Sequence, residues 1–237
     1  MNKNDKEIFE YFKIMYKKYK NNYFVKDKTG AKLVELLNVS LKLNPKNKII
    51  DLGERKTPIN YAKSEVEWYD SQSLYVKDIP YKTPQIWKQV SDDNGKINSN
   101  YGWIIYSKEN CYQYKNCLEE LKNNKASRRA MMIYQRPSIW EEYNKNNMGD
   151  FICTDNVQCF IRDNKLIYII TQRSCDLIYG FFNDYYWHAT VYNRFFNDLK
   201  EYYKNLKFGK ILYNIKSLHI YDKHFDLMKK VVKNKEG

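Results

Sequence analysis

The sequence has few of the side chains that build disulfide frameworks and metal centres. It contains five cysteines, an odd number, and no two of them form a Cys-x-x-Cys pair. Its three histidines do not have the spacing of zinc ligands. We therefore expect neither a disulfide framework nor a metal ion, and we expect a reducing compartment.

Long apolar runs are also lacking, and the N-terminal segment is charged and polar. A helix that spans a membrane needs about 20 mostly apolar residues, so we expect no membrane contact and a cytoplasmic location. A chain of 237 residues is long enough to bury a sizeable core, and we expect a single domain over residues 1–237.

The chain has fewer acidic residues than basic ones. The chain has 41 Lys and Arg against 28 Asp and Glu, which gives a formal net charge of +13. This excess favours an anionic partner, either nucleic acid or a phosphorylated small molecule. The lysines are scattered among many Asn and Tyr residues, a mixture that a nucleotide-composition bias in the gene would also produce. The charge therefore does not choose between these interpretations.

One predicted β-hairpin has a cysteine before it and an arginine after it. Apolar and polar residues alternate over 157–162, a polar pair follows at 163–164, and residues 166–171 form the returning strand. A hairpin of this length brings Cys153 close to Arg173. A neighbouring guanidinium favours the thiolate, which is the nucleophilic form of cysteine. The alternative is that Cys153 is a small buried side chain, as most free cysteines are.

Other segments show regular periodicity. Asn4 and Glu7 resemble a capping box at the start of an amphipathic helix, and residues 39–43 alternate as a strand. Apolar residues recur at helical spacing in residues 8–19, 111–121 and 191–206. We expect these segments to pack on the core through their apolar faces.

The polar residues in and around the hairpin resemble the thymidylate synthase superfamily in type and spacing. Cys153 is followed at the family's intervals by Gln172-Arg173-Ser174, Asp176, Gly180 and a polar residue at 184. Matching motifs elsewhere are Lys28-Thr29-Gly30, Glu65 in a Glu-x-x-Trp-Tyr helix, Trp87, Tyr101-Gly102, Arg128-Arg129 and Ser217-x-His219-x-Tyr221. The intervals that join Lys28, Glu65, Trp87, Tyr101 and Cys153 agree with the bacterial synthases. The arginine pair, however, lies farther from Cys153 than in those enzymes.

The resemblance implies a fold and a set of partners. The fold would be α+β, a large mixed β-sheet flanked by helices, dimerising through the sheet. The partners would be a pyrimidine nucleoside monophosphate and 5,10-methylenetetrahydrofolate as co-substrate, with no metal. The chain ends soon after the 217–221 motif, whereas the synthases continue into a tail that closes over the folate. We therefore expect this tail to be lacking, which would admit water to the site.

The resemblance also assigns the reacting groups. Cys153 would be the nucleophile, although the Pro-Cys-His of the family has become Ile152-Cys153-Thr154. Glu65 would be the acid and base that works through ordered water, since proton transfer at a pyrimidine ring needs a carboxyl group in a partly dry pocket. Asp176 would order water and contact the folate, and Tyr101 would lie beside the base.

Further residues would bind the rest of the two ligands. Trp87 and Gly180 match cofactor-side positions, and Arg173 and Ser174 match the pair that faces the phosphate and the cysteine. Lys28 stands where the family has an arginine, so it would meet the phosphate as a point charge without a bidentate fork. His219 and Tyr221 match residues that bind the sugar hydroxyl. Arg128 and Arg129 would reach the phosphate in the other subunit of a homodimer.

Asp184 is the most informative departure from the synthases, which have asparagine at this place. An asparagine amide accepts from N3–H of uracil and donates to O4, whereas cytosine has an acceptor at N3 and a donor at its 4-amino group. A protonated carboxyl group can donate to N3 and accept from the amino group, so Asp184 favours a cytosine nucleotide, most similar to the substrate of deoxycytidylate hydroxymethylases. The alternative is that Asp184 caps the following helix.

Two products are compatible with the resemblance. Addition of Cys153 at C6 makes C5 nucleophilic towards the one-carbon unit, after which water would give a hydroxymethyl group and hydride would give a methyl group. We expect dCMP hydroxymethylation. The alternatives are a dCMP methylase or thymidylate synthase, and a catalytically idle paralogue that binds nucleic acid through its basic surface.

The asparagine at the family's position suggests a direct test of base recognition. The substitution Asp184→Asn should move substrate preference from dCMP towards dUMP, because the amide pairs with uracil and leaves cytosine groups unpaired. The ratio of turnover on the two nucleotides measures the change. Asp163→Asn, the same substitution in the hairpin turn, is the control. Unchanged cytosine selectivity in the Asp184 variant would contradict the recognition argument.

Overall fold

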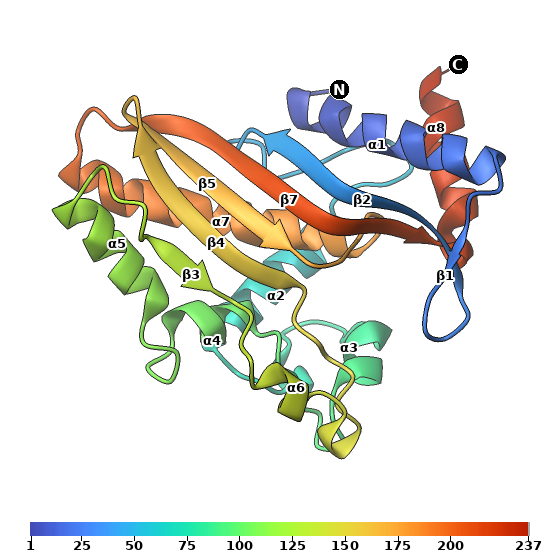
Figure 1. The fold of residues 1–237 in the computed structure, drawn as a ribbon, viewed down its shortest axis with the longest axis horizontal. Coiled ribbons are helices and arrows are strands. Elements are labelled where there is room, and N and C mark those ends of the chain that lie inside the picture. The colour runs from blue at the N-terminus through green and yellow to red at the C-terminus, as the bar shows by residue number, and fades with distance from the viewer. Residues whose placement is uncertain (237) are drawn as a thin grey trace.

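The computed structural model describes residues 1–236, and these residues form one mixed β-sheet with helices packed on it (Figure 1). The strands are β1 (Val25–Lys26), β2 (Lys32–Leu43), β3 (Met131–Ile133), β4 (Thr154–Arg162), β5 (Lys165–Gln172), β6 (Cys175–Asp176) and β7 (Lys207–Tyr221). They lie in the order β1-β2-β7-β5-β4-β3, and β6 pairs with β7 beyond the end of β5. The α+β sheet architecture expected from the sequence is confirmed.

The helices are distributed along the whole chain. They are α1 (Lys3–Lys20), α2 (Ile59–Ser71), α3 (Gln85–Val90), α4 (Tyr101–Tyr106), α5 (Gln113–Asn123), α6 (Ile139–Glu142), α7 (Gly180–Tyr202) and α8 (Phe225–Glu236). Short 3-10 turns lie at Val76–Asp78, Lys145–Asn147 and Asp222–His224. Within residues 1–236, no helix is long and apolar enough to cross a membrane.

The predicted hairpin is strands β4 and β5. Asp163 and Asn164 make its two-residue turn with φ of 50° and 57°, and the flanking residues Arg162 and Lys165 are paired. Asn and Asp tolerate this left-handed conformation, which matches the twist of the two strands. At the far end of the hairpin the backbone N–H of Arg173 donates to the Cys153 carbonyl oxygen at 2.9 Å. The closeness of these two residues is therefore confirmed.

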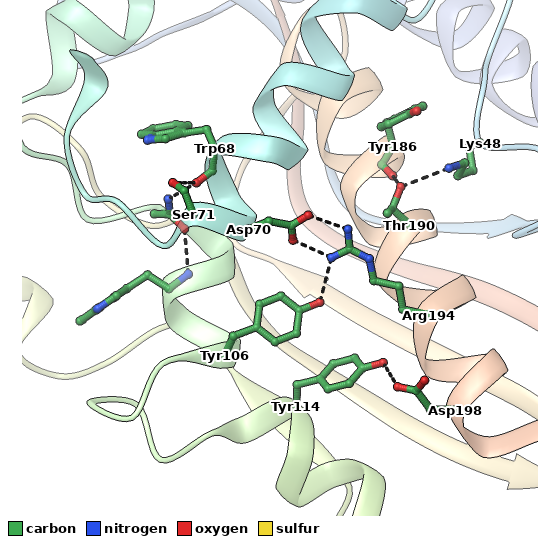
Figure 2. Close-up of polar contacts among 12 residues, drawn as sticks. Lys48, Trp68, Asp70, Ser71, Tyr106, Tyr114, Tyr186, Thr190, Arg194 and Asp198 are labelled. Carbon is green, nitrogen blue, oxygen red and sulfur yellow. Dashed lines mark hydrogen bonds and ion pairs between the residues drawn. The ribbon is translucent and has the colours of Figure 1, made fainter. Parts of the chain in front are cut away.

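Helix α7 connects β6 to β7 and lies behind the sheet in the view of Figure 1. Its aromatic residues face the sheet and are almost all buried, which gives the molecule its largest block of core. On its other side, the Arg194 guanidinium of α7 makes two 2.6 Å contacts with the Asp70 carboxylate of α2 (Figure 2). Asp198, one turn further, accepts from the Tyr114 hydroxyl of α5 at 2.6 Å. These contacts fix α7 relative to α2 and α5.

The front of the sheet is more open. None of the helices in residues 1–236 crosses in front of β4 and β5 in Figure 1. Side chains on this face are half-buried and partly apolar, and they are paired across strands: Phe160 opposite Ile167, and Ile169 beside Leu212.

Several predicted boundaries are wrong. Helix α1 is capped by Asn2 with Asp5, rather than by Asn4 with Glu7. Asn4 is instead buried, because its side-chain amide binds the carbonyl oxygens of Asn44 and Asn47. Helix α5 begins only at Gln113, and α7 runs over 180–202 instead of 191–206. Each error arises because a tertiary contact, which a local pattern does not contain, decides where the helix begins or ends.

A close approach between α2 and α4 gives a stability prediction. A Cβ at Gly102 would lie 1.8 Å from the Tyr69 carbonyl oxygen, so the two helix backbones would have to separate. Gly102→Ala should lower the free energy of unfolding by about 3 kcal/mol, measured by urea denaturation. Gly180→Ala is the matched control, since its Cβ would have an ordinary 3.9 Å contact and alanine favours helix. Equal stability of the two variants would contradict the close packing.

Candidate active site

Cys153 and Arg173 form the centre of the candidate site. The Arg173 guanidinium donates to the carbonyl oxygens of Ile152 at 2.9 Å and Phe151 at 2.6 Å, and its Nη2 lies 3.7 Å from Cys153 Sγ. The same guanidinium lies over the Phe151 ring at 4.8 Å from its centroid. Arg173 thus fixes the loop that carries the cysteine and places a positive charge beside the sulfur.

The net effect on the thiol is opposite to the simple expectation. Burial raises the pKa of Cys153 to about 12, Arg173 acts to lower it, and the negative charges of Asp184, Asp150 and Asp155 raise it further. The sequence predicted the arginine's contribution but not the desolvation, which is larger here. The thiol is therefore largely protonated at neutral pH, although Arg173 favours its ionised form.

Asp184 points into the same region from α7. Its Oδ2 accepts from Gln172 Nε2 at 2.8 Å, and burial raises the pKa of Asp184 to about 7 while the Gln172 hydrogen bond opposes the shift. The residue lies inside α7, whose N-cap is Tyr179, so the alternative that Asp184 caps the helix is wrong. Near neutral pH this carboxyl group can both hold and release a proton.

Gln172 connects Asp184 to Tyr101, the residue expected beside the base. The Gln172 amide also lies 3.4 Å from Thr154 Oγ1, and that hydroxyl donates to the Tyr101 oxygen at 3.1 Å. Gln172 and Thr154 are fully buried at the paired ends of β5 and β4. This chain orients the Asp184 carboxylate from the sheet side.

Glu65 supplies a second buried carboxyl group, from α2. The Tyr61 hydroxyl donates to Glu65 Oε1 at 2.5 Å, and Trp87 Nε1 donates to the Tyr61 oxygen at 2.7 Å. Burial raises the pKa of Glu65 to about 7, the Tyr61 hydrogen bond lowers it, and the charge of Asp184 raises it further. Two acidic groups with pKa values near neutrality therefore influence each other across one site, an arrangement suited to proton transfer.

A series of aromatic contacts leads from Arg173 to Lys28. The Lys28 ammonium contacts the Tyr143 hydroxyl and lies 4.9 Å from the centre of its ring. The Tyr143 and Phe151 rings are 5.4 Å apart, and Phe151 is the ring beneath Arg173. The two predicted phosphate-binding cations are thus placed on one side of the site, although Lys28 is exposed.

The predicted sugar contacts lie at the end of β7. The rings of His219 and Tyr221 are 4.9 Å apart, and His219 is paired with Asp176 of β6. Both the Arg173 and the Cys153 charges act on the pKa of Tyr221, so its hydroxyl lies close to the cysteine and the arginine. Ser174 is half-buried between Arg173 and the buried Cys175.

Asp176 and Gly180 stand at the entry to α7. Asp176 Oδ1 accepts from the backbone N–H of Ile178 at 2.9 Å, which closes the turn before the helix. Gly180 is the first residue of α7 and has room for a Cβ, so packing alone does not require glycine. Arg55 was not identified from the sequence; its buried guanidinium lies over the Tyr179 and Phe182 rings, 5.4 Å and 4.3 Å from their centroids.

Arg128 and Arg129 are not brought to Cys153 within the chain. They precede β3 and lie beside residues near the far end of β4 from Cys153, about 20 Å away along the strand. Arg129 is largely exposed and contacts Glu120 at 3.1 Å.

Sequence reasoning missed the positioning roles of three side chains: Tyr61, Gln172 and Arg55. Tyr61 lies one helical turn before Glu65, so its spacing was a usable signal. Gln172 is the inward-facing last residue of β5, which the alternation could have indicated. Among residues 1–236, no group of three or more His, Cys, Asp and Glu side chains is placed to hold a metal ion.

The site brings together Cys153 and Arg173, at the adjoining ends of β4 and β5, with the carboxyl groups of Glu65 from α2 and Asp184 from α7. This is the arrangement that the resemblance to thymidylate synthase-type enzymes implies. Residues 9–237 match the thymidylate synthase family model, and the chain belongs to this family. Deoxycytidylate 5-hydroxymethyltransferase of Enterobacteria phage T4 is 44% identical over 211 residues, covering 88% of this chain and 84% of the phage protein. The phage T2 protein of the same name has the same identity and coverage. Thymidylate synthase of Clostridium beijerinckii is 26% identical over 88% of this chain and 75% of its own length.

The buried Glu65 gives a prediction about stability and pH. Its pKa is raised in the folded state, so the folded protein keeps a proton that the unfolded chain releases above its ordinary pKa of 4.5. The stabilisation is fully present below that pH and is lost as the pH rises to about 7.

Relative to Glu65→Gln, the wild type should therefore lose roughly 3 kcal/mol of unfolding free energy between pH 4.5 and pH 8. Urea denaturation of both proteins over this range measures the difference. Glu67→Gln, an exposed change on the same helix, should show no comparable trend. A difference for the Glu65 variant that does not vary with pH would contradict the burial of this carboxyl group.

Proposed function

We propose that this protein is a deoxycytidylate 5-hydroxymethyltransferase that adds a one-carbon unit to C5 of dCMP. The observation that carries the proposal is the buried Asp184, whose carboxyl group is held by Gln172 and has a pKa of about 7. The 44% identity to phage proteins with that activity in their names supports it.

Asp184 fits the Watson–Crick edge of cytosine. A carboxyl group with a pKa near 7 is about half protonated at neutral pH, so it can donate to N3 and accept from the 4-amino group. An ionised carboxylate would place its lone pairs against the N3 lone pair. Uracil has N3–H and O4 at these positions, so in the same orientation the O–H of the acid would face a donor at N3 and its C=O would face an acceptor at O4.

Cys153 would act as the nucleophile. Its sulfur forms a bond to C6 of the ring as the thiol proton leaves, and Arg173 stabilises the sulfur charge on the way. Protonation at N3 by Asp184 draws electrons from C6 and makes this addition easier. When the S–C6 bond breaks at the end of the reaction, the electron pair returns to the sulfur and the double bond of the ring is restored.

Glu65 would handle the proton on C5. The carboxyl group has a pKa of about 7 and is oriented by Tyr61, so it can accept the C5 proton through water and then direct a water molecule to the new exocyclic carbon. Loss of the C5 proton would break the bond between the transferred carbon and tetrahydrofolate, which leaves, and water would then add to the exocyclic methylene to give the hydroxymethyl product.

The co-substrate 5,10-methylenetetrahydrofolate, which the family uses, supplies the one-carbon unit. We assign its binding to Asp176, Trp87 and Gly180. Arg55 fits the same ligand, because one nitrogen of its buried guanidinium, Nη2, has no partner among the described residues and a folate carries a negatively charged glutamate. The other nitrogens of Arg55 bind the carbonyl oxygens of Ile178 and Lys56, so its position is fixed.

The remaining assigned residues would bind the phosphate and the sugar of the nucleotide. Arg173 and Lys28 would bind the phosphate, with Ser174 beside Arg173, while His219 and Tyr221 would contact the sugar hydroxyl. Arg128 and Arg129 lie too far from Cys153 of their own chain to join them. In this proposal, Arg128 and Arg129 bind the phosphate in the partner subunit's site.

A homodimer through the sheet is part of the proposal. The front of β4, β5 and β7 carries half-buried apolar side chains, and no helix of residues 1–236 crosses β4 and β5 there (Figure 1). Leu37, on the neighbouring strand β2, is 71% exposed. An apolar sheet face of this kind supports burial against a second copy.

The product of the reaction tests the proposed function. We expect dCMP incubated with the protein and methylenetetrahydrofolate to gain CH2O, as measured by mass spectrometry, and dUMP to react much more slowly. A gain of CH2 would instead indicate a methyltransferase.

Cys153→Ser is the chemical control, and it should abolish exchange of the C5 hydrogen with solvent because no adduct at C6 can form. Exchange that persists in this variant would remove the nucleophile assignment. Salt-dependent binding to DNA without any turnover would favour the nucleic-acid-binding alternative.

A further inference from the structure

A buried histidine with no assigned role lies behind the candidate site. His188 is fully buried on the inner face of α7. Four tyrosine rings surround its imidazole at centroid distances of 5.7 to 6.3 Å: Tyr101 of α4, Tyr134 after β3, Tyr168 of β5 and Tyr213 of β7. We call these five residues the His188 cluster.

The His188 cluster gathers polar atoms that have no protein partner. Within residues 1–236, three such atoms lie in the cluster: both imidazole nitrogens and the hydroxyl of Tyr213. Each buried polar group without a hydrogen bond costs stability, so we expect these atoms to have partners in the folded protein. Internal water is the usual partner of such groups.

The chemistry of the cluster suits a hydrogen-bonded chain. Burial lowers the pKa of His188 to about 3, so the imidazole is neutral and has one donor and one acceptor nitrogen. Each tyrosine hydroxyl can donate one hydrogen bond and accept others. Side-chain hydrogen bonds with Trp187 and Tyr168 act to lower the pKa of the Tyr134 hydroxyl against the effect of burial, so these three groups are partners of one another.

One end of the cluster lies at Asp184. Asp184 is four residues before His188 on α7, so the two side chains share one helix face. Tyr213 and Tyr101, whose rings are 5.9 Å and 6.0 Å from the His188 ring, also lie near enough to Asp184 for its charge to raise their pKa. Gln172 binds only one of the two Asp184 oxygens, Oδ2.

We propose that the His188 cluster holds internal water molecules in a hydrogen-bonded chain that ends on the Asp184 carboxyl group and orients it towards the base. His188 is then a positioning residue for base recognition, a role that rests on the proposed function. The chain supplies a donor to Asp184 from the side opposite Gln172. Other titratable groups near Asp184 come from α2, α4, the loop before β4, β6 and β7: Glu65, Tyr61, Tyr69, Tyr101, Cys153, Cys175 and Tyr213. Gln172 of β5 is its hydrogen-bond partner.

Two substitutions at His188 separate positioning from packing. His188→Leu removes both nitrogens, and it should lower kcat/KM for dCMP by about tenfold or more, since misplacing a reacting group costs rate steeply. It should also move the alkaline limb of the pH profile to higher pH, because Asp184 loses a donor that stabilised its ionised form. His188→Gln keeps one donor and one acceptor and should restore most of the activity and the original pH midpoint.

Tyr192→Phe is the matched control. Tyr192 lies one turn after His188 on α7, and its hydroxyl donates to the Leu166 carbonyl oxygen at 2.9 Å, outside the cluster. This variant should lose stability without a change in the pH midpoint. A Leu variant of His188 that behaves in the same way, with unchanged preference for dCMP over dUMP, would overturn the positioning role.

A structural measurement, which does not depend on turnover, tests the water chain separately from the proposed function. A high-resolution crystal structure of the wild type should show ordered water bonded to His188 and linked to Asp184, whether or not dCMP is a substrate. Direct protein contacts at both imidazole nitrogens, with no such water, would overturn the chain. Ordered water together with no reaction on dCMP would instead contradict the proposed function and leave the water chain standing.

Discussion

The burial of two carboxyl groups in one pocket is the constraint on which this molecule depends. Glu65 and Asp184 come from helices α2 and α7, far apart in the sequence, and each has its pKa raised to about 7 mainly by desolvation. Burial of an ionisable group costs stability, so the site depends on contacts that hold α2 and α7 together and keep water out. The ion pair between Arg194 of α7 and Asp70 of α2 holds the two helices together. Gln172 donates to one oxygen of Asp184, and Tyr61 donates to one oxygen of Glu65.

The same burial explains why Cys153 is not simply an activated thiol. The apolar surroundings that keep Asp184 protonated also disfavour the thiolate, and they outweigh the neighbouring Arg173. The raised pKa of Cys153 and its proposed role as nucleophile are compatible only if the sulfur loses its proton when the nucleotide is bound. Under the proposed function, a base that is protonated at N3 accepts the sulfur more readily, so the sulfur need lose its proton only as the bond to C6 forms.

The sequence predicted the parts of this site that are local or that follow a family spacing. The hairpin, its turn and the closeness of Cys153 to Arg173 depend on alternation and chain length, and all three are confirmed. The cap of α1 was assigned to the wrong residue because Asn4 is used in a tertiary contact. The net pKa of Cys153 and the position of Arg55 were not predicted, because desolvation and tertiary contacts are properties of packed elements and not of a motif. Gln172 was identified in its motif, but its hydrogen bond to Asp184 was not predicted.

The dependence of the Asp184 pKa on packing affects how an enzyme that binds cytosine can arise from one that binds uracil. Replacing an asparagine by an aspartate changes the hydrogen-bonding pattern only if the new acid is neutral at the working pH. An aspartate in a well-solvated site has a pKa near 4 and would face N3 as an anion. Under the proposed function, selectivity for cytosine is a property of the whole site: Asp184 supplies the carboxyl group, and the packing of α7 against the sheet and α2 raises its pKa. Substitutions that loosen this packing should weaken base discrimination even where residue 184 is unchanged.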